Sequence, residues 1–289
     1  MSDLLILASL SALFGVLFGS FLNVCIFRVP RDLSVITPRS FCPSCGRQIS
    51  WYDNIPVLSY LLLGGRCRGC SARIPLRYPV VEITTALLFF ITVITFGPTL
   101  AALKWMIFES LMIVLLWTDA ELLLLPDEFT LGGIAIGLII SLFVPMPTLL
   151  ITFIAPNLTP KLSSLLASAV GAVVLSIPFA AFAYAYSTLR KLLDRAWGRG
   201  VDERSDLMPG LGDIKLLGTL GAFLGIEIGF IALLIGSLAG AVLGLTYILI
   251  TRKDPRTHHL PFGTFICAAA LLVEFFGSKI VRFWWGLGS

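Results

Sequence analysis

The chain has 289 residues, of which 57% are hydrophobic and only 13% are charged. An ordinary soluble domain carries about 25% charged residues, so these few charges could not cover a soluble core of this size. The composition excludes a soluble globular enzyme, a disordered chain and a nucleic-acid-binding protein. It predicts a multi-pass protein of a lipid bilayer, and the net charge of +4 requires no nucleic-acid partner.

Continuous apolar runs predict an all-α fold, because a transmembrane helix needs about 20 mostly apolar residues. About eight such helices are expected, the fourth bent at two prolines and the sixth interrupted by glycines and a glutamate. Their ranges are Leu4–Phe27, Val80–Phe96, Leu100–Thr118, Leu131–Ala155, Leu162–Leu189, Ile214–Leu224, Ile228–Ile250 and Leu260–Phe276. The first run has no basic segment before it and no small-residue cleavage site after it, so it is expected to be a permanent helix rather than a signal peptide.

The basic residues are distributed unevenly between the connections. Eight arginines lie in 28–79, five Lys and Arg lie in 190–212, and three lie in 251–259. Cytoplasmic loops carry such an excess of Lys and Arg. The pattern therefore predicts that these connections, together with 119–130, face the cytoplasm and that the N-terminus lies outside.

The largest connection contains two C-x-x-C pairs separated by 21 residues, Cys42 with Cys45 and Cys67 with Cys70. Four thiolates in this arrangement suit one tetrahedral Zn²⁺, although the gap is slightly longer than that of the usual zinc ribbon. Disulfides are the alternative, which a reducing cytoplasm disfavours. A structural ion is expected, since four thiolates leave no open coordination position. The other two cysteines, in predicted helices, are interpreted as packed apolar residues.

An acidic cluster follows the third predicted helix, with four carboxylates between residues 119 and 128 and no Lys or Arg among them. Asp127 could N-cap the next helix, and Glu128 would favour its dipole. Asp119 has no such explanation, because it lies at a helix C-terminus, where the dipole disfavours negative charge. Carboxylates at a membrane edge are costly and indicate function.

A second acidic motif, Gly210-Leu211-Gly212-Asp213, opens the sixth predicted helix. Asp213 could be a helix N-cap, but the predicted topology also places Asp119 and Asp213 at the same membrane depth. Two neighbouring carboxylates can share one proton, so that one activates water while the other protonates the leaving amide. Gly210 and Gly212 would let an extended peptide approach the backbone. The pattern predicts aspartic protease chemistry.

Taken in order, these motifs resemble the type IV prepilin peptidases, or leader peptidase/N-methyltransferases, of bacterial pilus and type II secretion systems, which belong to the GxGD membrane aspartyl proteases. The matching segments are Gly19–Val24 with Arg28–Pro30, the four cysteines, Arg77–Pro79 with Glu82, Asp119 with Pro126-Asp127, and Gly210–Asp213 with Lys215-Leu216. The resemblance runs nearly end to end. It implies a bacterial inner-membrane enzyme that removes the short basic leader of prepilins and pseudopilins at the cytoplasmic face.

The resemblance also implies that the enzyme methylates the new N-terminal amine with S-adenosylmethionine. Asp119 and Asp213 would be the catalytic pair, Gly210, Gly212 and Asp127 would support the site, and the four cysteines would bind zinc. Asn23, Arg77 and Glu82 are candidates for methyl transfer, and each could equally be a helix–helix hydrogen bond or an interface residue. The implied domains are a first helix (1–27), a cysteine-bearing segment (28–79) and a peptidase domain (80–289).

Two other functions remain open at this stage. A transporter or channel could use Asp119 with Glu109, Glu227 and Glu274 as a proton relay, but no internal repeat is apparent and the cysteines would be unexplained. A related membrane aspartyl protease that clears signal peptides is the other possibility, which the cysteine segment disfavours. Acidic residues that could attract a basic leader, or that could simply be solvated, are Glu121, Asp202, Glu203 and Asp206.

Overall fold

A computed structural model describes residues 2–146, 149–196, 210–251 and 261–284. These residues form helices and connecting loops, with no named strand among them. The chain divides into two compact units, Met1–Glu121 and Leu122–Ser289.

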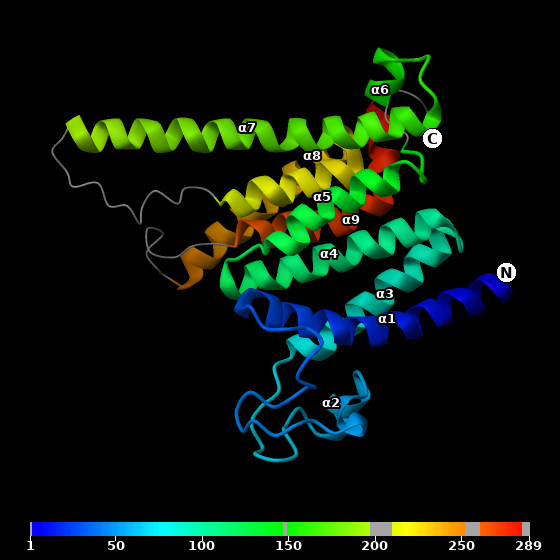
Figure 1. Cartoon of the computed structure of the whole chain (residues 1–289), viewed down its shortest axis with the longest axis vertical. Helices are drawn as coiled ribbons and strands as arrows, with labels where there is room; N and C mark the ends of the chain where they lie inside the picture. The colour runs from blue at the N-terminus through cyan, green and yellow to red at the C-terminus, as the bar shows by residue number, and fades with distance from the viewer. Residues whose placement is uncertain (1, 147–148, 197–209, 252–260, 285–289) are drawn as a thin grey trace. The chain divides into compact units, whose positions relative to one another are not determined.

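The first unit contains the helices α1 (Ser2–Arg28), α3 (Arg77–Phe96) and α4 (Leu100–Leu122). Helices α1 and α3 pack along each other (Figure 1). The contact is close because two glycines of α1 face the backbone of α3. A Cβ atom on Gly15 would lie 2.8 Å from Ala86 Cα, and one on Gly19 would lie 2.8 Å from Glu82 Cα. Small residues four apart allow backbones to approach in this way in membrane proteins.

The connection between α1 and α3 carries three short helical elements, η1 (Val29–Arg31), η2 (Trp51–Asn54) and α2 (Leu58–Leu62). Buried Arg28 holds the start of this connection. Its guanidinium donates to the carbonyls of Ser34 and Pro38, at 2.8 and 2.7 Å. The loop is thereby folded back over the end of α1, where the expected cysteine segment begins.

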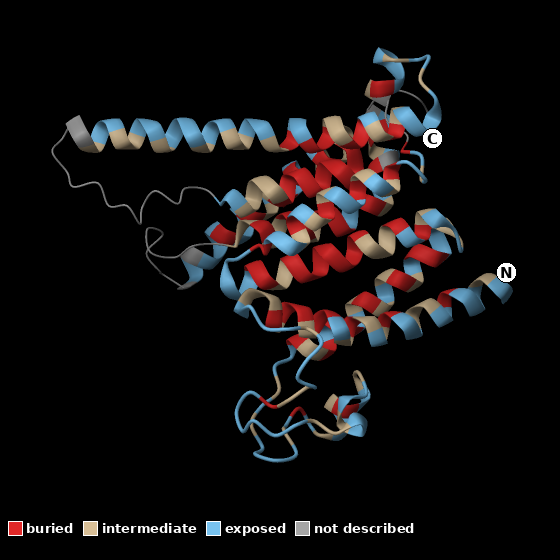
Figure 2. Ribbon diagram, viewed as in Figure 1, coloured by how far each residue is buried: buried red, intermediate tan, exposed pale blue. Residues whose placement is uncertain are grey.

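The second unit is a helix cluster of α5 (Asp127–Ser141), α6 (Leu149–Ile154), α7 (Pro160–Ala196), α8 (Leu211–Thr251) and α9 (Phe262–Trp284). Helix α8 packs against α5, α7 and α9, and its apolar side chains Leu216, Leu217, Leu220 and Phe223 are completely buried. Within this unit, Figure 2 shows buried residues in the first half of α7 and along α8. Beyond Leu175, the described residues of α7 are half-buried or exposed.

Gly225 interrupts α8, with φ of 74° and ψ of 179°, a conformation that is essentially restricted to glycine. A Cβ atom on Gly229 would lie 3.9 Å from Gly221 Cα, whereas residues eight apart in a straight helix are about 12 Å apart. The chain therefore folds back at Gly225, and the two arms of α8 run beside each other (Figure 1).

Five helices in the described part of the chain are long and apolar enough to cross a membrane, and Phe262–Gly277 is a shorter apolar helix. The prediction of about eight spans is therefore not confirmed, although the all-helical class is. The expected span Leu131–Ala155 is wrong as one bent helix, because α5 ends at Ser141 and α6 begins at Leu149. The sixth and seventh expected spans correspond to the two arms of α8.

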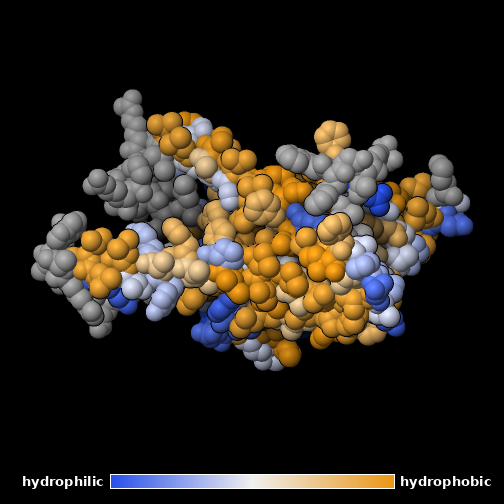
Figure 3. Space-filling model, turned by 90° about the horizontal axis from the view of Figure 1, so that it is seen from above, coloured by the Kyte–Doolittle hydropathy of each residue, from blue (hydrophilic) through white to orange (hydrophobic). Residues whose placement is uncertain are grey.

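Exposed apolar side chains cover much of these helices. Leu10, Leu13 and Phe14 of α1, for example, are all more than half exposed, and apolar surface dominates the face seen in Figure 3. Soluble monomers rarely carry apolar patches of this extent. The surface therefore supports the expectation of a membrane protein.

Candidate active and metal sites

The four cysteines of the first unit lie in two matching turns. An antiparallel bridge joins Phe41 to Gln48 in the first turn, and another joins Arg66 to Arg73 in the second. Within each turn the first cysteine carbonyl accepts a backbone hydrogen bond, from Gly46 at 2.8 Å and from Ser71 at 2.9 Å. Both donors have a positive φ, 69° and 59° respectively. The backbone thus presents two thiols from each turn.

The Sγ atoms of Cys42, Cys45, Cys67 and Cys70 all lie within 4.8 Å of one another. None of them is in a disulfide, and Cys42 Sγ and Cys70 Sγ are 3.9 Å apart. Four sulfurs around zinc, each about 2.3 Å from the metal, lie about 3.8 Å from one another. The cluster therefore has the size of a tetrahedral thiolate site, and it argues against the disulfide alternative.

Backbone N–H groups also favour the charged form of one ligand. Hydrogen bonds from the N–H groups of Cys70 and Gly69 lower the pKa of the Cys67 thiol to about 7. In the same turn a hydrogen bond with the Ala72 backbone lowers the pKa of Cys70, but desolvation and the other three thiols raise it to about 11; metal binding requires both groups as thiolates. The remaining two cysteines, Cys25 and Cys267, are buried in helices as predicted.

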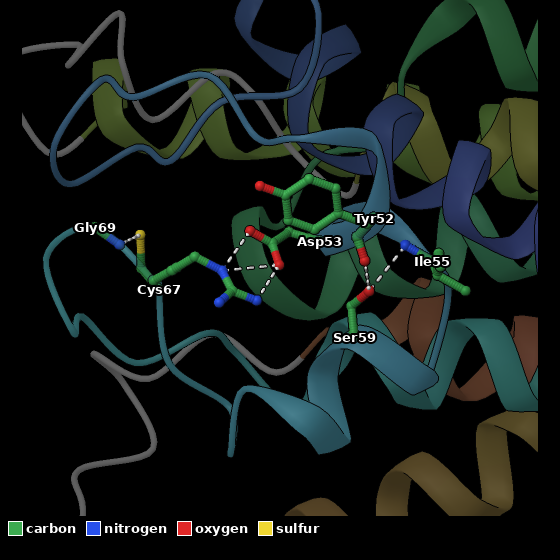
Figure 4. Close-up of polar contacts among 7 residues, drawn as sticks. Tyr52, Asp53, Ile55, Ser59, Cys67 and Gly69 are labelled. Carbon is green, nitrogen blue, oxygen red and sulfur yellow. Dashed lines mark hydrogen bonds and ion pairs between the residues drawn. The ribbon is translucent and has the colours of Figure 1, made fainter.

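An ion pair ties the second cysteine turn to η2. The Arg68 guanidinium donates to both carboxylate oxygens of Asp53, the shortest contact being 2.7 Å, and lowers the pKa of that carboxyl. In the same region the Ser59 hydroxyl donates to the Tyr52 carbonyl and accepts from the Ile55 N–H, both at 2.9 Å (Figure 4). These bonds fasten η2 and α2 beside the cysteines.

A cavity of about 720 Å³ lies between the cysteine turns, η2, the end of α1 and the start of α3. Its apolar wall comes from α1 and includes Phe21, Val24 and Phe27, while Tyr60 and Tyr78 contribute rings. All three methyl-transfer candidates, Asn23, Arg77 and Glu82, line this cavity. The structure thus brings together Asn23 of α1 with Arg77 and Glu82 of α3, although Glu82 follows Asn23 by 59 positions in the sequence.

Two of these candidates have buried polar atoms without a partner. Asn23 is 1% exposed; its Nδ2 donates to the Tyr78 carbonyl at 3.0 Å, and its Oδ1 has no hydrogen bond. Arg77 is 7% exposed; its Nη1 pairs with Glu121 Oε2 at 2.5 Å, and its Nε has no acceptor. An unsatisfied buried polar atom costs about 1–3 kcal/mol, so both atoms require an explanation.

The third candidate, Glu82, holds a strained turn. Its Oε2 accepts from the Val57 N–H at 2.7 Å. Val57 has φ of 61° and ψ of −52°, and the Leu58 N–H donates to the Pro56 carbonyl across it at 2.6 Å. This is the rare form of the γ-turn, which a β-branched residue seldom adopts. Nothing in the sequence indicates it.

Asp119 lies in the last turn of α4, in the first unit, and is 5% exposed. Asp213 lies in the first turn of α8, in the second unit, and is half-buried. The two aspartates therefore belong to different units, and their pairing stays a prediction. The alternative of Asp213 as an N-cap is wrong, because α8 begins at Leu211 and Gly210 precedes it.

Steric contacts explain why the second acidic motif has glycine at positions 210 and 212. A Cβ atom on Gly210 would lie 2.8 Å from Asp213 Oδ2, and one on Gly212 would lie 3.0 Å from the Cβ of Leu125. The Gly210 carbonyl also accepts from the Asp213 N–H at 2.8 Å. Glycine at both positions therefore leaves room for the Asp213 carboxylate and for the loop that precedes α5.

The interpretation of Asp127 as the N-cap of the helix that follows it is wrong. Pro126 occupies the N-cap position of α5, and Asp127 is its first helical residue. The Asp127 carboxylate instead accepts from Lys215 Nζ at 2.6 Å. One turn further along, the Thr219 hydroxyl donates to the Thr130 carbonyl at 2.8 Å. These bonds join the start of α5 to the start of α8 and so hold the Asp213 turn in place.

Three other acidic residues, Glu121, Glu109 and Glu227, have partners in the structure. Glu121 pairs with Arg77, which is a more specific role than a solvated charge. Glu109 accepts a hydrogen bond from Thr92, and Glu227 accepts from the Leu150 N–H in the first turn of α6. These bonds give the two glutamates structural roles and weaken the proton-relay alternative. Asp202, Glu203 and Asp206 lie outside the described residues.

Comparisons with known proteins match nearly the whole chain. Residues 13–96 match the bacterial peptidase A24 N-terminal domain, and residues 106–245 match the type IV leader peptidase family. A prepilin leader peptidase/N-methyltransferase of Myxococcus xanthus is 36% identical over 85% of this chain and 64% of its own length. Proteins of the same name from Aeromonas salmonicida and Bacillus subtilis are 33% and 32% identical, each over 96% of this chain and over 93% and 97% of their own lengths. No solved structure matches the chain.

Proposed function

The chain belongs to the type IV leader peptidase family, and we propose that it is a prepilin leader peptidase/N-methyltransferase. It cleaves the basic leader from prepilins and pseudopilins, and it then methylates the new N-terminal amine. The names of relatives that match over nearly their full length support both activities. The substrates would be membrane-anchored proteins, which suits an enzyme with several apolar helices long enough to cross a bilayer.

Asp119 and Asp213 form the proposed catalytic pair. The observation that carries this assignment is the turn at Gly210, where the absence of a side chain leaves space for the Asp213 carboxylate. Asp127 and Lys215 support that turn from α5. Asp127 is therefore a positioning residue, whereas Asp213 and Asp119 would contact the substrate.

The proposed reaction is the hydrolysis of one peptide bond. The ionised aspartate takes a proton from a water molecule, and the oxygen of that water attacks the scissile carbonyl carbon. The other aspartate, protonated, donates its proton to the leaving amide nitrogen as the C–N bond breaks. The first aspartate gains the proton that water loses, and the second gives its proton to the amide nitrogen. The pair therefore still holds one proton after the products leave.

The four cysteines are the proposed ligands of a structural Zn²⁺. Their mutual distances support this assignment. A bound zinc ion would supply folding energy to a segment with little core of its own. The methyl-transfer reaction would then depend on this segment (28–79) and its cavity, and the peptidase reaction on residues 80–289.

S-adenosylmethionine is the proposed methyl donor, because it supplies an electrophilic methyl group to an uncharged amine. The candidates Asn23, Arg77 and Glu82 are supported by their place on one cavity in the first unit. We place the enzyme in the bacterial inner membrane, with its N-terminus outside and both active sites at the cytoplasmic face. The clustering of arginines in 28–79 supports this orientation.

Cleavage of a prepilin in detergent tests the peptidase assignment. Asp119→Asn and Asp213→Asn should each abolish leader loss, measured by mass spectrometry, while thermal unfolding stays near that of the wild type. Glu128→Gln is the matched control, since it removes an exposed carboxylate of the same acidic cluster that is not in the proposed pair, and it should retain most of the activity. If either of the first two variants still cleaves near the wild-type rate, the assignment of the pair is wrong.

A further inference from the structure

We propose that the cavity of the first unit binds the methionine end of S-adenosylmethionine, with Asn23 and Arg77 as its recognition groups. The inference rests on the proposed methyltransferase function and adds the chemistry of its donor site. In this arrangement Asn23 Oδ1 accepts a hydrogen bond from the ligand ammonium group. Arg77 Nε donates to the ligand carboxylate.

Two residues that line the cavity each have a buried polar atom without a hydrogen-bond partner. Asn23 Oδ1 is a buried acceptor without a donor, and Arg77 Nε is a buried donor without an acceptor. Both residues line the cavity and both are more than nine-tenths buried. Native proteins satisfy nearly all such atoms. A ligand that brings one donor and one acceptor would therefore complete the site.

The two groups also lie near each other. Asn23 donates from Nδ2 to the carbonyl of Tyr78, which is the residue that follows Arg77 in α3. Asn23 Oδ1 therefore lies beside the first turn of α3, from which the Arg77 side chain extends. An α-amino acid group carries an ammonium and a carboxylate on one carbon, and this short spacing suits two protein groups on neighbouring helices.

The remaining walls suit the rest of this ligand. Glu82 places a carboxylate on the cavity, whereas the Glu121 carboxylate is paired with Arg77. Tyr60, Tyr78 and the apolar residues of α1 offer surfaces on which a purine ring can pack. A volume of about 720 Å³ lies within the range of small-molecule sites, roughly 300–1,000 Å³.

The acceptor amine of the cleaved substrate explains the site less well. A peptide N-terminus carries an ammonium or amine group but no carboxylate beside it, so it would leave Arg77 Nε unsatisfied. Glu121 already occupies Arg77 Nη1, and therefore the guanidinium offers the free Nε–H to a second, separate anion. The methyl donor supplies both groups, and the substrate peptide supplies one.

Isothermal titration calorimetry on the full chain in detergent tests this proposal with two probes. S-adenosylhomocysteine retains the amino-acid end, and 5′-methylthioadenosine lacks it. Asn23→Leu should weaken S-adenosylhomocysteine binding about 10- to 100-fold, as expected for one hydrogen bond to a charged group, with 5′-methylthioadenosine binding unchanged. Arg77→Lys, which keeps the charge but loses the Nε–H, should behave in the same way. Asn157→Leu, the same change on an exposed residue of the second unit, is the control and should bind both probes like the wild type.

Three results would overturn the proposal. Wild-type affinity of both variants for S-adenosylhomocysteine would show that the two groups do not contact the ligand. Equal loss of affinity for both probes would assign the residues to the shape of the cavity rather than to recognition. If the wild type transfers no methyl group to a leaderless peptide, the proposed methyltransferase function is wrong and the ligand site is wrong with it. If the wild type does transfer the methyl group, the binding results test only the assignment of Asn23 and Arg77.

Discussion

Gly210→Ala offers a severe test of the proposed catalytic role of Asp213. The new Cβ atom would lie 2.8 Å from Asp213 Oδ2, whereas ordinary contacts of a Cβ atom begin near 3.4 Å. The carboxylate must therefore move by about 0.6 Å. Gly210 does not have a positive φ, so alanine is compatible with the backbone.

The substitution should separate activity from stability. A displacement of about 1 Å at a reacting group can reduce the rate about 100-fold, and we expect a loss of about 10- to 100-fold in kcat for leader cleavage. Stability should change by less than about 1 kcal/mol, because the atom displaced is the end of a flexible side chain and alanine lowers the entropy of the unfolded chain.

Leader loss by mass spectrometry and thermal unfolding would be measured on the same detergent preparation. Gly132→Ala is the matched control, since a Cβ atom there meets no other atom within 4 Å, and both its activity and its stability should be retained. A Gly210→Ala enzyme that cleaves at the wild-type rate would refute the argument that the position of the Asp213 carboxylate matters for catalysis.

Three further predictions concern the metal, the packing and the ion pair. If the four cysteines bind zinc, Cys45→Ser should lower the zinc content of the purified protein, measured by elemental analysis, and abolish methyl transfer; a zinc content equal to that of the wild type would contradict the four-thiolate site. Gly221→Ala places a Cβ atom 2.1 Å from the Gly171 carbonyl oxygen, so it should cost at least about 2 kcal/mol in thermal unfolding, and an unchanged melting temperature would contradict the packing of α7 on α8. Lys215→Met removes an exposed ion pair with Asp127 and should cost less than about 1 kcal/mol, with cleavage reduced no more than a few-fold; complete loss of cleavage would give Lys215 a direct role.

The sequence predicts the helical class and the cysteine cluster because both depend on local patterns. Apolar runs and C-x-x-C spacing are visible in the chain without knowledge of its folding. The helix count fails where a local pattern is ambiguous. The run from Leu131 to Ala155 is apolar throughout, but α5 ends at Ser141 and a separate α6 follows, because proline at 145 removes a backbone donor and cannot continue the helix.

The contacts of the candidate site could not be predicted in the same way. The Glu82 bond to Val57 depends on a turn that the preference of valine for extended backbone opposes. The pairs Lys215–Asp127 and Arg77–Glu121 join residues 88 and 44 positions apart, and only the folded chain brings them together. Candidate residues were identified by type and order, whereas their partners required the structure.

The two cysteine turns have a consequence for ligand affinity that follows from their place in the chain. The segment between them carries η2 and α2, which form one wall of the cavity. A metal held by both turns therefore closes a loop that includes this wall, and it restricts the conformations available to an empty cavity. Thermodynamic linkage makes the effect mutual. The factor by which bound metal tightens the binding of a cavity ligand is also the factor by which that ligand tightens the binding of the metal.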